Sequence, residues 1–416
     1  MGRASAGDHD RARRGRARAC RGRSPPARSR QLRRLHEVRR ESQLEASARV
    51  ARRRTLRVVC DRGRQTPPRS NRCQRVVTSM QVPTGRSPEE VLRDAVAAAV
   101  KAPSSHNTQP WKFRISNDVL DLFVDDARHL RVIDPARRQL VQSCGCALYN
   151  ARVAVRAQGF HDEVTVMLVD GQHPDHLATL HLRGMNVPSD DDRERMKALA
   201  IRHTNRREFL ARPVAAEHTD AMAADAEREG AKLVRILPDQ KLAIAHLVDH
   251  ADRLQLDDRA FRDELGRWLV PSGSLRRDGI PFAEKEFGSP WPLAKLRALR
   301  SPHLASAFGQ LEEERTLASP AIVVIGTAKD EATDWLACGQ ALEAVLLRAT
   351  MLGLSASFLN QVLEIPDLRR RIGEIVTDVG YPQMVLRIGA AASPIRHPAP
   401  RRHLEEVLEI VAGRRA

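Results

Sequence analysis

The amino-acid sequence predicts an α+β fold of two fused, pseudo-symmetric halves, each with a largely antiparallel sheet flanked by helices. In the first half, strand-like runs occur in pairs, as antiparallel hairpins require. Long segments with helical periodicity separate the strand-like runs, and one such segment recurs far along the chain. We assign residues 80–188 to the first half, residues 189–416 to the second half, and residues 1–79 to a separate leader.

The leader differs in composition from the rest of the chain. Residues 1–79 contain 24 arginines, no lysine and six acidic residues, a formal charge of +18, whereas the whole chain of 416 residues carries +17. Such low hydrophobicity and high charge predict disorder. A basic arm could bind nucleic acid, but no aromatic residue for base stacking precedes Trp111, so a nucleic-acid partner is not expected. Translation of high-GC DNA upstream of the true start codon would also give arginine without lysine. We therefore hypothesise that Met80 is the natural first residue.

The remaining residues predict a cytoplasmic protein. Cys144, Cys146 and Cys338 are the cysteines after Met80, and this odd number argues against a disulfide framework. No run of eighteen apolar residues occurs, so we expect no contact with a membrane.

The elements of the first half follow from local signals. Ser87, Pro88 and Glu90 form a capping-box pattern that begins a helix ending near residue 102. Strands are predicted over 111–115 and 119–124, joined by the turn-forming pair Asn117-Asp118. A long helix over 136–158 and two further strands over 164–169 and 177–182 complete this half.

The second half begins at Ser189, because the three aspartates that follow it favour a helix start. Strands are predicted over 232–237 and 321–325, and helices over 239–254, 332–352 and 402–413. Residues 266–318 are rich in proline, glycine and tryptophan. We interpret this insertion either as a lid over a binding site or as a mobile surface excursion.

Residues 144–159 (CGCALYNARVAVRAQG) align without gaps with residues 338–353 (CGQALEAVLLRATMLG). The Cys-Gly pair near the start of each segment predicts a close helix–helix approach, and the final glycine predicts a C-cap. Chance similarity of two alanine-rich helices is the alternative. Because the cysteine recurs in both halves, packing explains it better than redox chemistry, and we expect no metal site. The matched positions are Cys144/Cys338, Gly145/Gly339, Ala147/Ala341, Leu148/Leu342 and Gly159/Gly353.

The most informative stretch for function is residues 103–111, PSSHNTQPW, between the first predicted helix and the first strand. Its hydroxyl and amide side chains donate and accept hydrogen bonds, and the prolines stiffen both ends. Such a strip suits a planar polar heterocycle better than a metal or a peptide. An ordinary surface turn is the alternative.

This stretch resembles the P-S-x-x-N-x-Q-P-W motif of the FMN-dependent nitroreductase family. Residues 202–206 (RHTNR) resemble the family's R-[RH]-[ST]-x-R signature, with Thr204 where serine is usual, and residues 400–402 (PRR) resemble its C-terminal basic pair. Residues 278–281 (DGIP) and 358–361 (FLNQ) are similar to the fused, actinobacterial, Acg-like NAD(P)H nitroreductases. The resemblance covers about residues 85–416.

The resemblance implies a single FMN site inside one chain. In two-subunit members the Ser/Asn loop and the arginine signature come from different subunits, whereas here one lies in each half. We therefore expect a monomer with an internal dimer-like interface and one flavin.

The resemblance also implies residue roles. Pro103, Ser104, Ser105 and Asn107 would line the ring edge with support from Gln109, and Arg202 would approach the N1/O2 side of the ring. The phosphate would be held by Thr204, Arg206, Arg401 and Arg402, and Asn360 or Gln361 would lie near N5. No catalytic side chain is expected, because hydride would pass directly between the nicotinamide, the flavin and the acceptor.

Two functions follow from these expectations. The first is an FMN-dependent oxidoreductase that uses NAD(P)H to reduce nitro- or quinone-like small molecules. The second is a flavin-binding protein that stores FMN beneath a lid.

Overall fold

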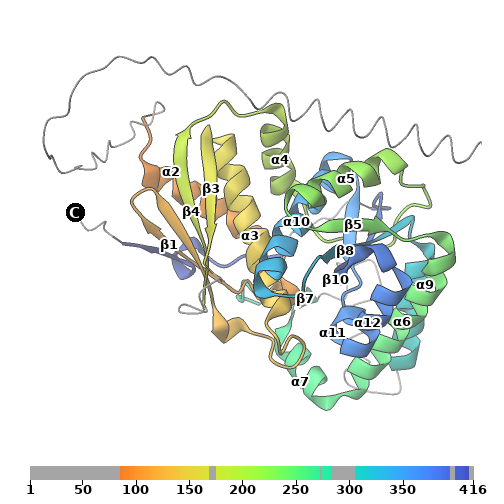
Figure 1. Cartoon of the computed structure of the whole chain (residues 1–416). Helices are drawn as coiled ribbons and strands as arrows, with labels where there is room; N and C mark the ends of the chain where they lie inside the picture. The colour runs from red at the N-terminus through yellow and green to blue at the C-terminus, as the bar shows by residue number, and fades with distance from the viewer. Residues whose placement is uncertain (1–84, 168–174, 272–273, 283–304, 394–398, 412–416) are drawn as a thin grey trace, which may run out of the picture. The chain divides into compact units, whose positions relative to one another are not determined.

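The computed structural model describes residues 85–167, 175–271, 274–282, 305–393 and 399–411, all within the unit Thr78–Ala416 (Figure 1). The side chains of residues 282 and 305–309 also lie outside this description. The predicted leader and part of the predicted insertion fall outside these ranges.

The first sheet contains five strands in the order β11–β1–β2–β4–β3. Neighbouring strands are antiparallel except β1 and β11, which are parallel. Residues of β1 alternate between buried and exposed, so one face of this strand joins the core and the other faces solvent. The strands are β1 (Trp111–Ser116), β2 (Val119–Val124), β3 (Phe160–Val166), β4 (His176–Met185) and β11 (Leu408–Ile410).

The second sheet contains four antiparallel strands in the order β5–β8–β10–β9. Every residue of β8 is buried, because the sheet is covered on both faces. Val323 and Ile325 enter the core shared with the first sheet, whereas Ile322 and Val324 enter a second core on the opposite face. The strands are β5 (Lys232–Arg235), β8 (Ala321–Thr327), β9 (Ser355–Phe358) and β10 (Tyr381–Gly389). A short parallel pair, β6 (Leu269–Pro271) and β7 (Ile280–Phe282), lies apart from both sheets.

Two long helices, α3 (Arg138–Ala157) and α10 (Ala332–Met351), lie between the two sheets (Figure 1). With α2 (Pro88–Ala99) they contribute to the main core. The second core is closed by α6 (Pro238–Asp257), α11 (Gln361–Glu364) and α12 (Pro366–Ile375). The other helices are α4 (Asp190–Ile201), α5 (Ala216–Arg228), α7 (Arg259–Trp268) and α9 (Ala305–Ala318).

The predicted helix starts and ends are confirmed where the sequence carried capping signals. Ser87 and Glu90 form the capping box of α2, and Ser189 forms another with Asp192 at the start of α4. Gly159 (φ 88°) follows α3 and Gly353 (φ 70°) follows α10. A left-handed residue just past a helix is the conformation that favours glycine.

The repeated Cys-Gly pair lies where α3 and α10 meet. A Cβ atom added to Gly145 would lie 2.4 Å from the carbonyl oxygen of Leu336, and one added to Gly339 would lie 2.1 Å from that of Gln142. Neither distance leaves room for a side chain. The Cys146 thiol donates to the carbonyl oxygen of Gly339 at 3.1 Å, across the same crossing. The predicted close approach of the two helices is therefore confirmed.

The predicted helix over 402–413 is wrong. Residues Leu404–Glu406 form a short 3₁₀ turn (η5), and β11 then pairs with β1 through Phe113 N donating to Val407 O at 2.7 Å and Val411 N donating to Ile115 O at 2.9 Å. The stretch LEEVLEI has helical periodicity, but an edge of the first sheet supplies backbone partners that a local pattern does not reveal.

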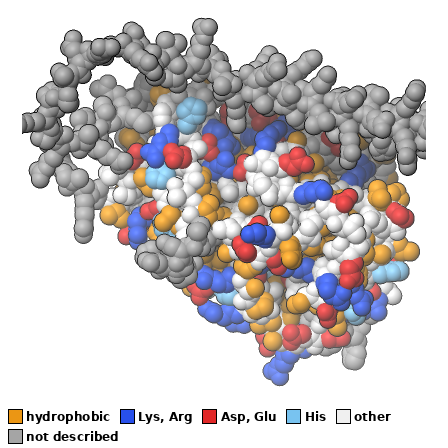
Figure 2. Space-filling model, in the orientation of Figure 1, with side chains coloured by type: hydrophobic (Ala, Val, Ile, Leu, Met, Phe, Trp, Pro, Cys, Tyr) orange, Lys and Arg blue, Asp and Glu red, His pale blue; other side chains and the backbone are white. Residues whose placement is uncertain are grey.

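In the described residues, no helix combines the length and the apolar composition needed to cross a bilayer. Figure 2 shows basic and acidic side chains interspersed over the described surface, as expected when the charge outside the leader is near zero.

Candidate functional site

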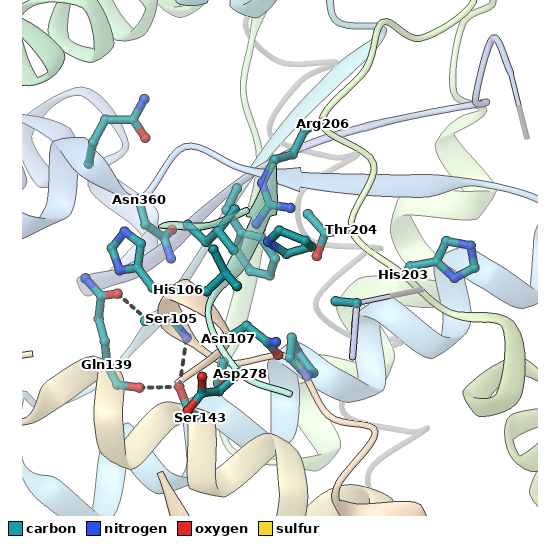
Figure 3. A pocket seen from close by; sticks show the side chains of 18 of the residues that line it. Ser105, His106, Asn107, Gln139, Ser143, His203, Thr204, Arg206, Asp278 and Asn360 are labelled. Atoms are coloured by element: carbon teal, nitrogen blue, oxygen red, sulfur yellow. Dashed lines mark hydrogen bonds between the residues drawn. The ribbon is translucent and has the colours of Figure 1, made fainter. Parts of the chain in front are cut away.

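A cavity of about 540 Å³ brings together segments from distant parts of the chain. Its size falls within the range of small-molecule and cofactor sites. Residues 103–107 form one wall and residues 202–207 another (Figure 3). Parts of 270–281, 358–361 and 399–401 complete the lining. The Ser/Asn loop and the arginine signature therefore meet at one cavity.

The Ser/Asn wall is a 3₁₀ turn, η1 (Ser105–Asn107), between α2 and β1. Ser105 Oγ donates to Gln139 Oε1 at 2.6 Å, and Ser105 N donates to Ser143 Oγ at 3.4 Å, which ties the turn to α3 (Figure 3). Ser104 Oγ accepts from Gln109 N at 3.0 Å. These bonds fix the turn on rigid elements, so its polar groups are preorganised.

The arginine wall begins at Arg202, the C-cap residue of α4. Asn205 N donates to Ala356 O at 2.9 Å, and Thr204 forms a parallel bridge with the same residue, which holds the stretch against β9. Arg202 Nε lies 3.3 Å from Glu343 Oε1 on α10. The buried side chain of Glu343 therefore positions this guanidinium beside the cavity.

Arg202 and Arg401 are neighbours, because both guanidinium groups donate to the carbonyl oxygen of Lys101 at 3.1 Å. Burial and the charge of Arg202 lower the pKa of Arg401 to about 10. Burial likewise lowers the pKa of Arg206, which Glu312 opposes. An anion in the cavity would therefore be favoured beside Arg401 and Arg206, because it would stabilise their charged forms against burial.

The residues that line the cavity have the chemistry needed to bind FMN. Arg401 Nε is buried and has no hydrogen-bond partner among the described residues. A phosphate group would supply the acceptor that Arg401 Nε lacks, and it would place negative charge beside both arginines. The hydroxyl and amide groups of the Ser/Asn turn suit the polar edge of a heterocycle.

Most of the predicted site residues line this cavity. They are Pro103, Ser104, Ser105, Asn107, Arg202, Thr204, Arg206, Asn360, Gln361 and Arg401. Asn360 is also bound to β10, since its Oδ1 accepts from Val385 N at 3.1 Å.

Gln109 and Arg402 do not line the cavity. Gln109 is fully buried and its Oε1 accepts from Arg402 N at 2.8 Å. Arg402 pairs with Asp125 and with Glu406, at 3.3 Å in each case. Its predicted contact with the phosphate is therefore not supported, and it holds the C-terminal loop against Asp125 instead.

Several lining residues were not predicted, and they form a second polar wall. Glu364 accepts from Gln139 Nε2 at 2.8 Å and from Gln255 Nε2 at 2.5 Å. Asp252 accepts from Gln361 Nε2 at 3.1 Å. Polar side chains spaced three residues apart on α6, Asp252 and Gln255, were the available signal, but the sequence does not show which helix face is buried.

The cysteines are packing residues, as predicted. Cys144 donates to Pro110 O at 3.3 Å, and all three described thiols are buried and free. Burial raises the pKa of Cys338 to about 12 and raises that of Cys146 strongly. A thiol held protonated in this way is a poor nucleophile and a poor metal ligand.

Comparison with known proteins supports the assignment to a family, although no family model matches the chain. "Putative NAD(P)H nitroreductase Rv3131" of Mycobacterium tuberculosis strain H37Rv is 34% identical over 327 residues, which span 77% of this chain and 91% of that protein. The chain belongs to the nitroreductase family. "Putative NAD(P)H nitroreductase acg" of the same strain is 29% identical over 340 residues, which span 78% of this chain and 96% of that protein. The predicted family, and with it the prediction of an oxidoreductase, is confirmed.

Among solved structures, the FMN- and NADPH-dependent nitroreductase NfnB of a Sphigopyxis strain is 18% identical and covers 52% of this chain and 97% of its own, with a TM-score of 0.35. So weak a structural likeness adds nothing to the assignment, which depends on the sequence relatives.

Proposed function

We propose that this member of the nitroreductase family binds one FMN per chain and uses NAD(P)H to reduce nitro- or quinone-like acceptors. The observation that carries the proposal is the single cavity shared by the Ser/Asn turn and the Arg202–Arg401 pair. When bound there, FMN would supply the hydride chemistry.

The chain's own residues would bind and orient the cofactor. Ser105 and Asn107 would line the ring edge, with Asn360 or Gln361 near N5. Arg202 and Arg401, which lie together, would bind the phosphate with Thr204 and Arg206. Arg202 was expected to approach the ring. We place it at the phosphate instead, because it shares the Lys101 carbonyl oxygen with Arg401, whose Nε has no hydrogen-bond partner in the described part of the chain.

The proposal includes an internal dimer-like interface in a monomer. The α3–α10 crossing supports it, because the repeated glycines Gly145 and Gly339 meet there. Sedimentation of the FMN-loaded chain, with the flavin counted by absorbance, tests it: a monomer with one flavin agrees, and a dimer with two shared sites does not.

The decisive experiment is to express residues 80–416, load the protein with FMN and add NADH or NADPH without oxygen. We expect a yellow protein whose flavin absorbance disappears on reduction. A protein that takes up no FMN would contradict the whole proposal.

Arg206→Ala is expected to weaken FMN binding by about ten- to a hundredfold, because a charge-assisted hydrogen bond contributes about 1.5–3 kcal/mol. Fluorescence quenching of free FMN during titration measures the dissociation constant. Arg371→Ala, an exposed arginine of α12, is the matched control. Equal affinity in the two variants would remove Arg206 from the site.

One observation favours the second function, FMN storage. The segment 277–279, within the predicted lid, is bonded to the Ser/Asn turn. Asn107 Nδ2 donates to Gly279 O at 3.1 Å, Gln109 Nε2 donates to Arg277 O at 2.8 Å, and Arg128 pairs with Asp278 at 2.8 Å. A segment held down in this way could exclude the nicotinamide.

Asp278→Asn separates the two functions. Although burial opposes it, ion pairing with Arg128 and Arg276 lowers the pKa of Asp278, so the carboxylate is ionised and holds the segment. Its loss should speed anaerobic bleaching by NADPH about tenfold if the segment limits access. Stopped-flow absorbance measures this rate, and Asp239→Asn on α6 is the control. An unchanged rate would mean that the segment does not control entry.

A further inference from the structure

His106 lies at the centre of a strained turn on the cavity wall. Its backbone adopts φ 50° and ψ 21°, and Asn107 (φ 56°) and Gln109 (φ 52°) are also left-handed. Elsewhere in the described residues, only Asn117 and Arg137 are non-glycine residues with positive φ. Each such residue costs about 1–3 kcal/mol, and strain of this kind persists mainly where function requires a particular geometry.

The other polar side chains of the turn carry no group that titrates near neutral pH. The hydroxyl groups of Ser104 and Ser105 bind Gln109 N and Gln139 Oε1, and the Asn107 amide binds Gly279 O and Pro400 O. His106 is the one titratable residue of the 104–109 turn, and it lines the cavity (Figure 3). Imidazole can both give and take a proton near neutral pH.

The other acidic groups that face this cavity are bonded to neighbouring side chains; Glu312, for example, accepts from Arg315 at 3.0 Å. Four carboxylates come from α6, the segment before β7, α9 and α11: Asp252, Asp278, Glu312 and Glu364. Glu364 and Asp252 accept amide hydrogen bonds, and ion pairing lowers the pKa of Asp278 against the effect of burial. Cys146 is held protonated by burial, and its hydrogen is directed to Gly339 O.

The basic side of the cavity is formed by Arg202, Arg206, Arg207, Arg276, Arg401 and His203. Burial first, and then the charges of Arg202 and Arg401, lower the pKa of His203. In Figure 3 the His203 ring lies far from the Ser105–Asn107 turn. His203 therefore belongs to the anion-binding side and is neutral there.

We propose that His106 protonates the acceptor while it is reduced. This inference rests on the proposed function, which supplies the hydride. A quinone that gains a hydride and one proton from His106, at a carbonyl oxygen, becomes a hydroquinone. A nitro group that gains a hydride and one proton has one N–O bond broken: the oxygen departs as water, and a nitroso group remains on the acceptor. The imidazole then recovers its proton from solvent.

The test uses the FMN-loaded chain, reduced anaerobically with NADPH and mixed with either a quinone or ferricyanide over a range of pH. Ferricyanide takes electrons without a proton, so it does not need the donor. In the His106→Gln variant we expect reoxidation by the quinone to slow about a hundredfold. With the quinone, the reoxidation rate of the original chain should fall as the imidazole loses its proton at higher pH, and the variant should lack this fall. With ferricyanide, the variant and the original chain should be reoxidised at the same rate. His161→Gln, at an exposed histidine of β3 that does not line the cavity, is the matched control and should keep the pH-dependent step.

A readout that needs no turnover is the imidazole NMR spectrum of the oxidised, FMN-loaded protein. The signal that His106→Gln removes should shift when nitrobenzene is added. If His106→Gln fails to fold, the unaltered chain still decides the matter, because equal pH profiles with quinone and ferricyanide overturn the inference. A His106→Gln variant with the original rate and pH profile overturns it too, while leaving the proposed function intact. If neither NADH nor NADPH reduces the bound flavin, both this inference and the proposed function are overturned.

Discussion

Replacing Gly339 with alanine is expected to lower the free energy of unfolding by about 2–3 kcal/mol, because the added methyl group overpacks the α3–α10 crossing. The new Cβ would lie 2.1 Å from the carbonyl oxygen of Gln142 and 2.9 Å from its Cα. Both atoms belong to the backbone of α3, so no side chain can move aside. The helices would have to separate, and the buried cores beside them would lose contacts. Urea denaturation followed by circular dichroism measures the change.

The matched control is Gly266→Ala on α7, where a Cβ would meet no atom within 4 Å. Alanine is favoured over glycine within a helix by about 1 kcal/mol, so this variant should be as stable as the original or more so. If Gly339→Ala and Gly266→Ala had the same stability, the glycine contact would not hold the two helices at their distance.

The elements that local signals define could be predicted from the sequence. The capping boxes at Ser87 and Ser189 and the glycines that end α3 and α10 depend on neighbouring residues alone. Strand β10 (Tyr381–Gly389) was not predicted, although it lies between β8 and β9 and most of it is buried. Its apolar run has no alternation, because both faces of the sheet are covered, and such a run resembles a buried helix. Strand β11 was missed because its partner lies almost 300 residues earlier.

The candidate site likewise combines residues that a local motif identifies with residues that only the folded chain brings together. The motif residues Ser105, Asn107 and Thr204, which line the cavity, could be singled out because each lies in a short, distinctive string. Asp252 and Glu364 were not, because the structure brings α6 and α11 to the cavity through contacts that depend on the whole second core. Arg402 was expected at the cavity but is not part of its lining, since two adjacent arginines give no indication of which side chain Asp125 will bind.

Glu343→Gln is expected to flatten the dependence of stability on pH. Burial raises the pKa of Glu343 to about 7 in the folded protein, from 4.5 for an exposed glutamate, and Arg202 and the Asn150 amide oppose this shift without cancelling it. The folded state therefore holds the proton more tightly than the unfolded chain does. This stabilisation is fully present below about pH 4.5 and is lost as the pH rises through 7.

Because glutamine does not titrate, the free energy of unfolding of the variant relative to the original chain should rise across this range, by up to about 3 kcal/mol. Urea denaturation at pH 5, 6, 7 and 8 gives that difference. Glu217→Gln, an exposed residue of α5, is the control and should show none. A difference that stayed constant from pH 5 to 8 would mean that Glu343 keeps its charge throughout. Arg202 would then have a permanent counter-ion, and the basic wall of the cavity would bind an anion less strongly than a pair of uncompensated arginines.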